Sequence, residues 1–454
     1  MGLLPDAPLI LGDGHLMEYY SVDASGYSVK PRGVALPRSV GDVADVVRWA
    51  AQNRTPVTAR GAGTGLAGGA LGDGIILDTS RMDRVRYLDG VVSAGPGARL
   101  GAVARLLSGY GRILGPNPSV GPYCSVGGMV ATNASGSLSL GYGSIIDNLE
   151  SVTLVDGRGD VVELPSNRHY SDIISGICRR AGPFPDTTKN SCGYRLDAVP
   201  SPDMSHRVVA ASEGTLGVVV GARLRTHPAP RRRALAVMRY ADARSAAADC
   251  PRILECGPVS LEVVGPGIME GYGGSCVLFA EFHDSVPERG GPDHADRVCG
   301  DVRRAAGVRP VMIREGIDRW LAGRNAALSR SLGMTGDRAP SIIEDATVPL
   351  ERLPDLFDVI RELGERTGST PVYYGHAGSG NIHVRTPADS RVTEWYLCEV
   401  MALGGTITGE HGDGMGRTGF VRRQYGEQNH MLFGLLKDAF DPHHILNPGK
   451  ILPA

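Results

Sequence analysis

The chain has 454 residues, of which 42% are hydrophobic and 21% are charged, a composition typical of globular proteins. Its 47 basic and 49 acidic residues nearly balance, so no overall field favours binding to nucleic acid or to an anionic membrane. Eight cysteines are scattered from Cys124 to Cys398 without a CxxC pair, which argues against structural zinc, an iron–sulfur cluster or a disulfide framework.

The ends and length of the chain give further expectations. The N-terminus lacks a basic region and no apolar run approaches membrane-spanning length, so we expect no signal peptide, no membrane span and a cytoplasmic location. A chain of 454 residues exceeds what one hydrophobic core usually holds, which predicts two domains.

In chain order, the first half alternates short strands with amphipathic helices. Ser39 caps a predicted helix whose apolar positions follow helical spacing: Val43, Val46, Val47 and Ala50. Strands are expected up to Arg60, over 74–80 and over 91–97, and the last leads into a helix with Leu100, Val103, Leu106 and Leu107. The composition of 113–136 predicts little regular structure, and the pattern of 149–164 predicts a β-hairpin.

A boundary is expected at 226–233, the stretch THPAPRRR, because the composition changes there. After it glycines are fewer and apolar strands such as 275–282 alternate with helical stretches. Residues 284–297 and 329–341 are polar and glycine-rich, which predicts mobile loops.

Glycine is unusually frequent, with 63 residues bunched in a few segments. The stretch 61–69, GAGTGLAGG, matches GxGxxG, but the next strand begins before a helix could fit, so a dinucleotide-binding turn is not expected. We instead predict a loop whose amides form a concave anion site, with a turn that binds nothing as the alternative. Two more small-residue segments, 120–148 and 212–218, would let the backbone surround a pyrophosphate and its adjoining ring.

Histidines cluster near the C-terminus. The stretch YYGH–AGSG–NIHV predicts a tight hairpin that brings His376 and His383 within reach of one metal ion, and Glu410 would complete a two-histidine, one-carboxylate set. Ordinary loop histidines are the alternative, since the spacing is not HExxH. Glu410 and His411 would point to opposite faces of a regular strand, but Gly409 and Gly412 permit an irregular turn.

Taken together, these motifs resemble known flavoproteins. RGAGTGLAGG (60–69), CSVGGMVATNASG (124–136), KNSCGY (189–194) and SEGTLGV (212–218) resemble, in order and spacing, the vanillyl-alcohol-oxidase-type FAD-binding domain. GHAGSGNIHV (375–384), GEHGDG (409–414) and HILNPGKIL (444–452) resemble the FAD-linked oxidase C-terminal domain. The whole is similar to the D-2-hydroxy-acid dehydrogenases, which include D-lactate dehydrogenase, the glycolate oxidase catalytic subunit and D-2-hydroxyglutarate dehydrogenase.

The resemblance implies an α+β fold. It places a FAD-binding domain of two subdomains at 30–228 and an α+β substrate domain with an antiparallel sheet at 229–454, with about 405–454 returning to the FAD domain. The first glycine loop has no histidine for a covalent tether, so we expect non-covalent FAD. The residues implied to bind it are Arg60, Gly61, Ala62, Gly63, Thr64, Gly65, Leu66, Pro118, Ser125, Gly127, Gly128, Thr132, Asn133, Ser135, Gly136, Tyr142, Glu213, Gly214, Gly217, Val218 and Asn447.

The implied reaction is oxidation of a D-2-hydroxy acid to the 2-oxo acid, with hydride transfer to FAD. His376, His383 and Glu410 would hold zinc, iron or manganese, which lowers the pKa of the substrate hydroxyl. His411 would be the general base, and Arg324, in the segment 317–327, would bind the substrate carboxylate. From the sequence alone, a surface arginine on an amphipathic helix explains Arg324 equally well.

Two departures from the family pattern qualify this implication. Ser379 stands where the family has Asp, and Ile343 stands where relatives acting on D-2-hydroxyglutarate carry Lys, which argues against binding of a distal carboxylate. Larger relatives carry a fused iron–sulfur domain that this chain lacks, so we expect a separate iron–sulfur or electron-transfer flavoprotein partner, a quinone, a dye-like acceptor or oxygen. A homodimer is a further expectation.

Three other functions stay open at this point. The first is a transferase resembling alkyldihydroxyacetonephosphate synthase, which uses the same fold without net oxidation. The second is oxidation of a specialised biosynthetic alcohol. The third is a non-catalytic flavin-binding subunit, against which the complete set of His376, His383 and Glu410 counts.

Overall fold

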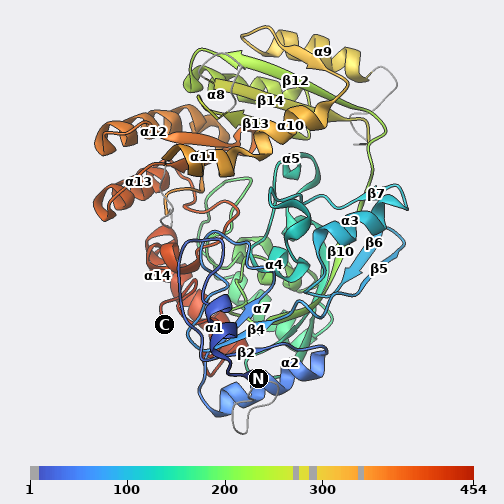
Figure 1. The fold of residues 1–454 in the computed structure, drawn as a ribbon, viewed down its shortest axis with the longest axis vertical. Helices are drawn as coiled ribbons and strands as arrows, with labels where there is room; N and C mark the ends of the chain where they lie inside the picture. Colours follow the sequence, from blue (N-terminus) through green and yellow to red (C-terminus); the bar gives the residue numbers. More distant parts are fainter. Residues whose placement is uncertain (1–9, 269–275, 286–293, 336–341) are drawn as a thin grey trace.

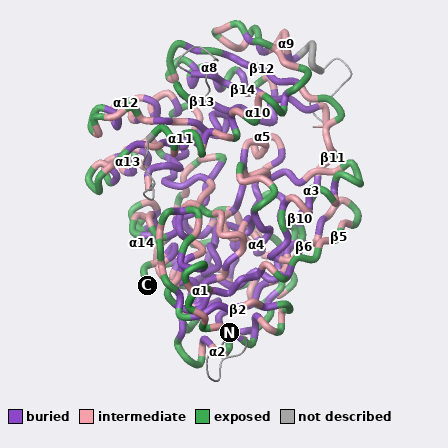
Figure 2. The backbone as a smooth tube through the Cα atoms, in the orientation of Figure 1, coloured by how far each residue is buried: buried purple, intermediate pink, exposed green. Residues whose placement is uncertain are grey.

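The computed structural model describes residues 10–268, 276–285, 294–335 and 342–454. It places two small sheets at one end of the molecule and a larger sheet with its helices at the other (Figure 1). Buried backbone runs through both ends, and exposed stretches lie on the outer helices and turns (Figure 2).

A four-stranded sheet of order β1-β2-β4-β3 begins the chain. Its strands are β1 (Ile10–Leu11), β2 (Gly33–Ala35), β3 (Val57–Arg60) and β4 (Ile75–Asp78), with β4 parallel to both β2 and β3. After α1 (Gly14–Tyr20), helix α2 (Val40–Gln52) begins at Ser39, whose side chain accepts a hydrogen bond from the Asp42 amide. The four predicted apolar positions of α2 are all buried against the sheet, so this prediction is confirmed.

A five-stranded antiparallel sheet has the order β5-β6-β10-β8-β9. Its strands are β5 (Val85–Leu88), β6 (Val91–Ala94), β8 (Leu149–Val155), β9 (Val161–Leu164) and β10 (Val218–Arg225), and β8 and β9 form the hairpin predicted over 149–164. The associated helices are α3 (Leu100–Ser108), α4 (Val126–Ala131), α5 (Ser139–Tyr142), α6 (Ile145–Asn148) and α7 (Arg168–Cys178). A two-stranded ribbon of β7 (Arg112–Ile113) and β11 (His227–Pro228) lies at the end of this half.

A seven-stranded antiparallel sheet of order β15-β12-β14-β13-β17-β18-β16 forms the second half. Its strands are β12 (Arg233–Tyr240), β13 (Ser260–Val264), β14 (Cys276–His283), β15 (Val311–Ile313), β16 (Ala346–Thr347), β17 (Val372–His376) and β18 (Asn381–Arg385). The helices are α8 (Ala243–Glu255), α9 (His294–Ala305), α10 (Ile317–Asn325), α11 (Ala327–Thr335), α12 (Leu353–Thr367), α13 (Ser390–Ala402) and α14 (Gly414–Phe440). The predicted α+β fold with an antiparallel sheet is therefore confirmed.

Three predicted irregular segments contain helices, so those predictions are wrong in part. Helix α4 lies inside 113–136, α9 begins inside 284–297, and α11 covers the start of 329–341. The remaining residues of the two predicted mobile loops, 286–293 and 336–341, lie outside the described residues. Helix α11 buries Ala327 and Ser331, small residues that do not stand out as a hydrophobic repeat.

The end of the chain packs on the first sheet. The Val57 amide donates to the Ile445 carbonyl at 2.7 Å, and the Asn447 amide donates to the Val57 carbonyl at 2.8 Å. These bonds extend the β3 edge, and they lead us to propose that about 405–454 belongs to the FAD domain. The boundary at 228/229 itself stays a prediction.

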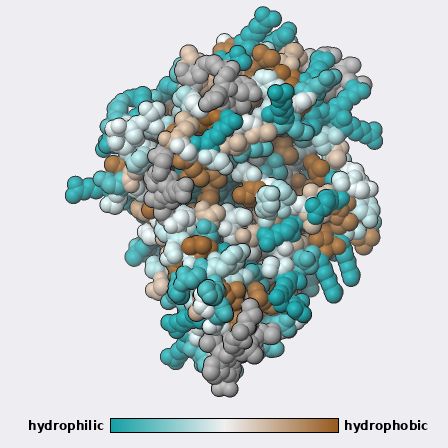
Figure 3. All heavy atoms as spheres, in the orientation of Figure 1, coloured by the Kyte–Doolittle hydropathy of each residue, from teal (hydrophilic) through white to brown (hydrophobic). Residues whose placement is uncertain are grey.

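The visible surface is mostly hydrophilic, with small hydrophobic areas scattered over it (Figure 3). Within the described residues, no helix has the length and apolarity needed to cross a membrane. All eight cysteines are free thiols in this structure.

Candidate active site

A long cavity lies between the glycine-rich segments of the first half and the second half of the chain. It encloses about 1300 Å³ of empty space, part of it open to solvent, and is lined by residues from 59–70, 118–135 and 213–214. Glu410 and His411 line the same cavity. The predicted cofactor loops and part of the predicted metal cluster therefore face one space.

Most of the predicted cofactor residues lie in this cavity wall. They are Arg60, Gly61, Ala62, Gly63, Thr64, Gly65, Leu66, Pro118, Ser125, Gly127, Gly128, Thr132, Ser135, Glu213 and Gly214. The wall also includes residues that were not among the predicted cofactor residues, such as Ala59, Gly69, Thr79, Pro96, Met129, Val219 and Leu328.

Six predicted cofactor residues lie outside the cavity wall: Asn133, Gly136, Tyr142, Gly217, Val218 and Asn447. The Tyr142 hydroxyl lies 2.7 Å from His283 Nδ1, and Val218 packs in the core of the first sheet. Asn447 instead holds the loops in place, because its Nδ2 donates to the carbonyls of Gly69 and Glu213 at 2.9 and 2.7 Å. Asn447 would therefore support the cofactor loops without lining the cavity.

The residues that line the cavity suit a flavin dinucleotide chemically. Its wall is made largely of main-chain groups and small side chains, and the segment 61–69 forms a loop without a helix, as predicted. At Gly61 a Cβ atom would meet Ser125 Oγ at 2.0 Å, so only glycine lets the two loops approach so closely. Backbone amides exposed in this way suit a pyrophosphate.

The predicted histidine hairpin forms, with one difference in register. Strands β17 and β18 pair so that His376 lies opposite Asn381, while His383 lies opposite Tyr374. The two histidines are therefore diagonal neighbours on one face rather than a directly facing pair. Their ring centroids are 5.4 Å apart, and Gly380 takes the left-handed conformation, with φ +66°, that closes the turn.

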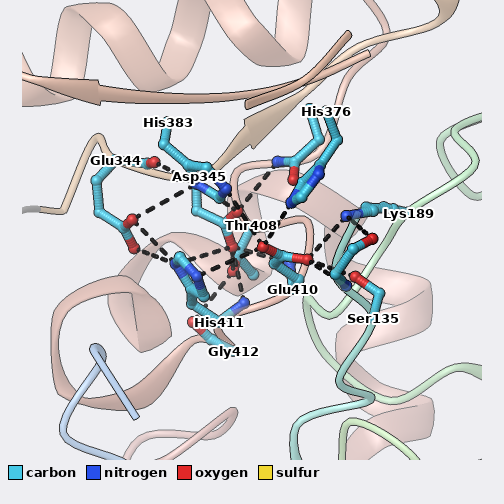
Figure 4. A network of polar contacts seen from close by, with 12 residues as sticks. Ser135, Lys189, Glu344, Asp345, His376, His383, Thr408, Glu410, His411 and Gly412 are labelled. Atoms are coloured by element: carbon cyan, nitrogen blue, oxygen red, sulfur yellow. Dashed lines mark hydrogen bonds and ion pairs between the residues drawn. The ribbon is translucent and has the colours of Figure 1, made fainter. Parts of the chain in front are cut away.

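Both imidazoles point at one carboxylate oxygen (Figure 4). Glu410 Oε1 lies 3.1 Å from His376 Nε2 and 3.2 Å from His383 Nε2. Zinc ligands lie about 2.0–2.2 Å from the ion, so ligands that share one ion are about 3 Å apart. The three donors therefore fit a divalent cation that prefers nitrogen and oxygen ligands.

The outer nitrogens of the two imidazoles are held by other groups. His376 Nδ1 lies 2.8 Å from Glu262 Oε1, and His383 Nδ1 lies 3.2 Å from the Glu344 carbonyl. Such contacts fix the ring orientation and leave Nε2 available to a cation. The family's Asp is replaced by Ser379, which is buried next to the hairpin turn and whose carbonyl accepts a bond from Thr188.

The second oxygen of Glu410 is bound by the first half of the chain. Lys189 Nζ lies 2.8 Å from Oε2, the Gly136 amide donates to it at 3.1 Å, and the Ser135 hydroxyl also bonds to it. Burial disfavours the charged carboxylate, but Lys189 and His376 outweigh this and hold the pKa of Glu410 well below its usual range. Glu410 is therefore an anion whose Oε1 faces the two imidazoles.

His411 lies beside this cluster, and its ring stacks on His383 at 5.0 Å. Its Nδ1 is 2.7 Å from Glu344 Oε1, and its Nε2 is 3.7 Å from Glu410 Oε1. Burial alone would lower the pKa of His411, but the carboxylates of Glu344 and Asp345 outweigh it and raise the pKa to about 10. An unperturbed imidazole titrates near neutrality instead.

Glu344, His383 and His411 form a second group of potential metal ligands. The Glu344 carboxylate already pairs with Arg417 Nη2 at 2.8 Å in addition to His411. A cation there would compete with a buried guanidinium, so His376, His383 and Glu410 are the better candidate centre.

Arg324, the predicted substrate clamp, is buried on α10 with only 3% of its surface exposed. It forms an ion pair with Glu262, and its Nη2 lies 3.4 Å from His376 Nδ1. A surface position is therefore excluded, but the guanidinium already has a carboxylate partner. Its Nε has no hydrogen-bond partner, and the residue lines a smaller cavity on the His376 side.

Sequence reasoning missed the residues that orient the cluster: Lys189, Glu262, Glu344, Asp345 and Arg417. A charged residue within an apolar strand, as in SLEVV around Glu262, is unusual enough to have indicated a buried partner. Asp345 Oδ2 accepts hydrogen bonds from the amides of both Glu410 and His411, at 2.9 and 2.8 Å. These bonds stabilise the irregular turn that Gly409 and Gly412 were expected to permit.

Comparisons with known proteins agree with this two-part arrangement. Residues 31–165 match the family model described as FAD binding domain, and residues 229–451 match that described as FAD linked oxidases, C-terminal domain. The chain belongs to the FAD-linked oxidases.

Three relatives illustrate the range of this FAD-linked oxidase family. The chain is 30% identical to a D-2-hydroxyglutarate dehydrogenase of Escherichia coli over 95% of its own length and 49% of the relative's. It is 27% identical to a D-lactate dehydrogenase of Anaerostipes hadrus, covering 93% and 90%, and 26% identical to the glycolate oxidase subunit GlcD of Bacillus subtilis, covering 95% and 91%. The chain thus spans about half the length of the D-2-hydroxyglutarate dehydrogenase that it matches.

Among solved structures, the chain resembles alkyldihydroxyacetonephosphate synthase. The TM-score is 0.68 at 17% identity, with 99% of this chain and 83% of that chain covered. At this identity the likeness shows the fold alone.

Proposed function

We propose that the protein oxidises a D-2-hydroxy acid to the 2-oxo acid in a metal-assisted reaction, with non-covalent FAD as hydride acceptor. The observation that carries the proposal is that His376, His383 and Glu410 converge at one point, and that Glu410 and His411 also line the cavity that fits FAD. We further propose that the reduced flavin passes its electrons to a separate acceptor and that the protein is cytoplasmic.

The two bound groups would supply the chemistry that side chains lack. FAD, when bound along the glycine-rich loops, accepts a hydride. A divalent cation, when bound to His376, His383 and Glu410, polarises a substrate hydroxyl or carboxylate oxygen.

The chain itself would position the substrate and move its proton. His411 would take the hydroxyl proton at Nε2, because Glu344 occupies Nδ1 and orients the ring towards Glu410. In the protein without a cation His411 holds its proton tightly. A neighbouring positive charge would oppose protonation and make the imidazole available as a base.

Arg324 would act on the substrate carboxylate from the His376 side. Its pairing with Glu262 neutralises much of its charge, and its unpartnered Nε is buried out of reach of a ligand. This weakens the original expectation of a full cationic clamp.

The deciding experiment is anaerobic reduction of the flavin by D- and L-2-hydroxy acids, followed by absorbance, with and without a chelator. The proposal expects bleaching by a D-acid that chelator abolishes. Bleaching by no acid would overturn it and favour a transferase resembling alkyldihydroxyacetonephosphate synthase, a non-catalytic flavin subunit or oxidation of a specialised biosynthetic alcohol.

A further inference from the structure

One loop of the cavity wall, residues 119–125, lines the cavity at both its ends and faces solvent in its middle. Ser119 and Ser125 line the cavity proposed to bind FAD, whereas Pro122 and Tyr123 between them are exposed, Tyr123 by 72%. The helical turn Gly121–Tyr123 therefore lies directly outside the cavity. An electron that left a flavin in the cavity would have only this loop to cross before it reached the surface.

Helix α3 packs beside this loop and extends the same surface. A Cβ atom at Gly101 would lie 2.5 Å from Pro122 Cβ, so the helix and the loop are in close contact there. Arg105 lies four residues further along α3, on the same side of the helix as Gly101, and is exposed. Arg99, which precedes the helix, is also exposed and donates from Nη1 to the Tyr123 carbonyl at 2.7 Å. We call Arg99, Arg105, Pro122 and Tyr123 the arginine face.

The positive charge of the arginine face is not compensated by neighbouring acids. Although the chain has 49 acidic residues, none lies between Asp89 and Asp147, and the same segment contains Arg99, Arg105 and Arg112. Within the part of the chain that the structure describes, Arg105 makes no hydrogen bond or ion pair, and Arg99 bonds to a main-chain carbonyl. Figure 1 shows α3 at the outer edge of the molecule, beside β5 and β6. The arginine face is therefore open to a partner.

Exposed arginine and tyrosine side chains suit a protein partner of opposite charge. Both residue types are enriched in protein interfaces, and charges at the rim of an interface steer the association with a partner of opposite sign. The face is small, and small interfaces are typical of electron-transfer complexes, which bind weakly and separate after each transfer. A nucleic acid would be another acidic partner, but the chain as a whole has no excess of positive charge.

We propose that the arginine face docks an acidic electron-carrier protein that reoxidises the flavin. The inference rests on the proposed function, which needs an acceptor for the electrons of the reduced flavin. Two oxidised carrier molecules would each take one electron from FADH2, which returns to FAD with release of two protons to water. The loop 119–125 keeps carrier and flavin close together, and Arg99 and Arg105 attract and orient the carrier.

Docking can be measured without any electron transfer. The probes are plastocyanin, an acidic copper protein, and cytochrome c, a basic haem protein, each titrated in its oxidised form into the oxidised holoenzyme by calorimetry. We expect plastocyanin to bind at least about tenfold more tightly than cytochrome c at low salt. Its affinity should fall about tenfold as NaCl rises from about 0.02 to about 0.2 M, because salt screens exposed charges.

Two variants locate the binding site. Arg105→Glu and the double variant Arg99→Gln/Arg105→Gln should each remove most of the preference for plastocyanin. Since Arg105 makes no hydrogen bond or ion pair in the described part of the chain, Arg105→Glu keeps the test valid even if the double variant fails to fold. Arg303→Gln/Arg391→Gln is the control: both arginines are exposed on helices of the second half, so the net charge changes by two, as in the double variant, without an effect on plastocyanin.

Electron transfer is tested separately, with the flavin reduced by dithionite rather than by a hydroxy acid and then mixed rapidly with oxidised plastocyanin. We expect the rate of flavin reoxidation at low salt to fall about tenfold in Arg105→Glu. Equal binding of the two probes, a preference for plastocyanin that survives both variants, or an unchanged reoxidation rate overturns the inference. So does a single-stranded oligonucleotide that binds more tightly than plastocyanin and loses its affinity in Arg105→Glu.

The outcome for the arginine face is independent of the outcome for the reaction. If plastocyanin docks through Arg105 and reoxidises the dithionite-reduced flavin, but no hydroxy acid reduces that flavin, the docking surface stands and the proposed reaction falls.

Discussion

At the scale of single residues, Lys189 defines the candidate metal centre as much as the ligands do. It is buried and pairs with one oxygen of Glu410, which leaves the other oxygen for the imidazoles. Without Lys189, only the Ser135 hydroxyl and the Gly136 amide would hold this oxygen, and the orientation of the Glu410 carboxylate would be less fixed. The cation site therefore depends on a residue 221 positions away in the sequence.

Replacement of Lys189 should weaken metal binding. We expect Lys189→Met to lower the affinity for Zn²⁺ by about 10–100-fold, because loss of a group that orients a ligand usually costs this much. Lys189→Arg should restore part of the loss, which a purely steric role would not. Competition with a chromogenic chelator measures the affinity, and an unchanged affinity in a folded Lys189→Met protein would contradict this role.

The pH dependence of the reaction rate should be set in part by Glu344. Its carboxylate is the main favourable charge that raises the pKa of His411, so Glu344→Gln lowers that pKa and makes the base available at lower pH. The acid limb of the pH–rate profile should move down by about one to three units. A profile that does not move would show that His411 is not the group that titrates; Glu351→Gln, at an exposed position, is the control.

At the scale of elements, the turn 409–414 brings together groups that a strand would separate. Gly409 is packed so closely that a Cβ atom would lie 2.3 Å from Thr347 Oγ1 and 2.6 Å from Asn381 Nδ2. Gly412 has φ +84°, a conformation that side chains disfavour. The turn can therefore form only with glycine at these positions.

Alanine at Gly409 should displace the turn. We expect Gly409→Ala to lower the free energy of unfolding by about 1–3 kcal/mol through overpacking, and to lower metal affinity because Glu410 follows directly. Gly419→Ala is the matched control: Gly419 lies exposed in α14 with nothing within 4 Å, so alanine should stabilise by up to about 1 kcal/mol. Chemical denaturation of both variants checks the pair, and equal effects would refute the packing argument.

Sequence patterns predicted these elements well where the cause is local. The helix cap at Ser39 and the glycine turn of the β17–β18 hairpin were both predicted, because each depends on interactions between residues a few positions apart. Helix α11 was missed because its buried positions, Ala327 and Ser331, are not hydrophobic in the usual sense. The partners of Glu410 and His411 could not be predicted, since long-range ion pairs leave no periodic trace.

At the scale of the whole molecule, the end of the chain supports the cofactor loops. Asn447 is buried, adopts a positive φ of +43°, and ties Gly69 and Glu213 together through one amide. Lys437 adds buried bonds to the carbonyls of Thr215 and Leu446, at 2.8 and 2.7 Å. The C-terminal residues thus fix the position of the loops that line the cavity, without lining it themselves.

Asn447→Ala should release these loops. One buried and one half-buried carbonyl would lose their donor, so we expect a loss of about 1–3 kcal/mol in stability and a lower FAD content after gel filtration. Asn53→Ala, which removes one exposed bond to the Trp49 carbonyl, should do neither. Full FAD retention in a destabilised Asn447→Ala protein would separate the structural effect from the proposed support of the cofactor.

Glu410 also has a consequence for how the two ends of the molecule hold together. One of its oxygens faces ligands from the second half, while the other is bound by Ser135, Gly136 and Lys189 from the first. A cation at the first oxygen and the docked first half at the second both favour the same orientation of one side chain. Because such coupling is reciprocal, metal binding would stabilise the contact between the two halves. Separation of the halves would in turn lower the affinity for the metal.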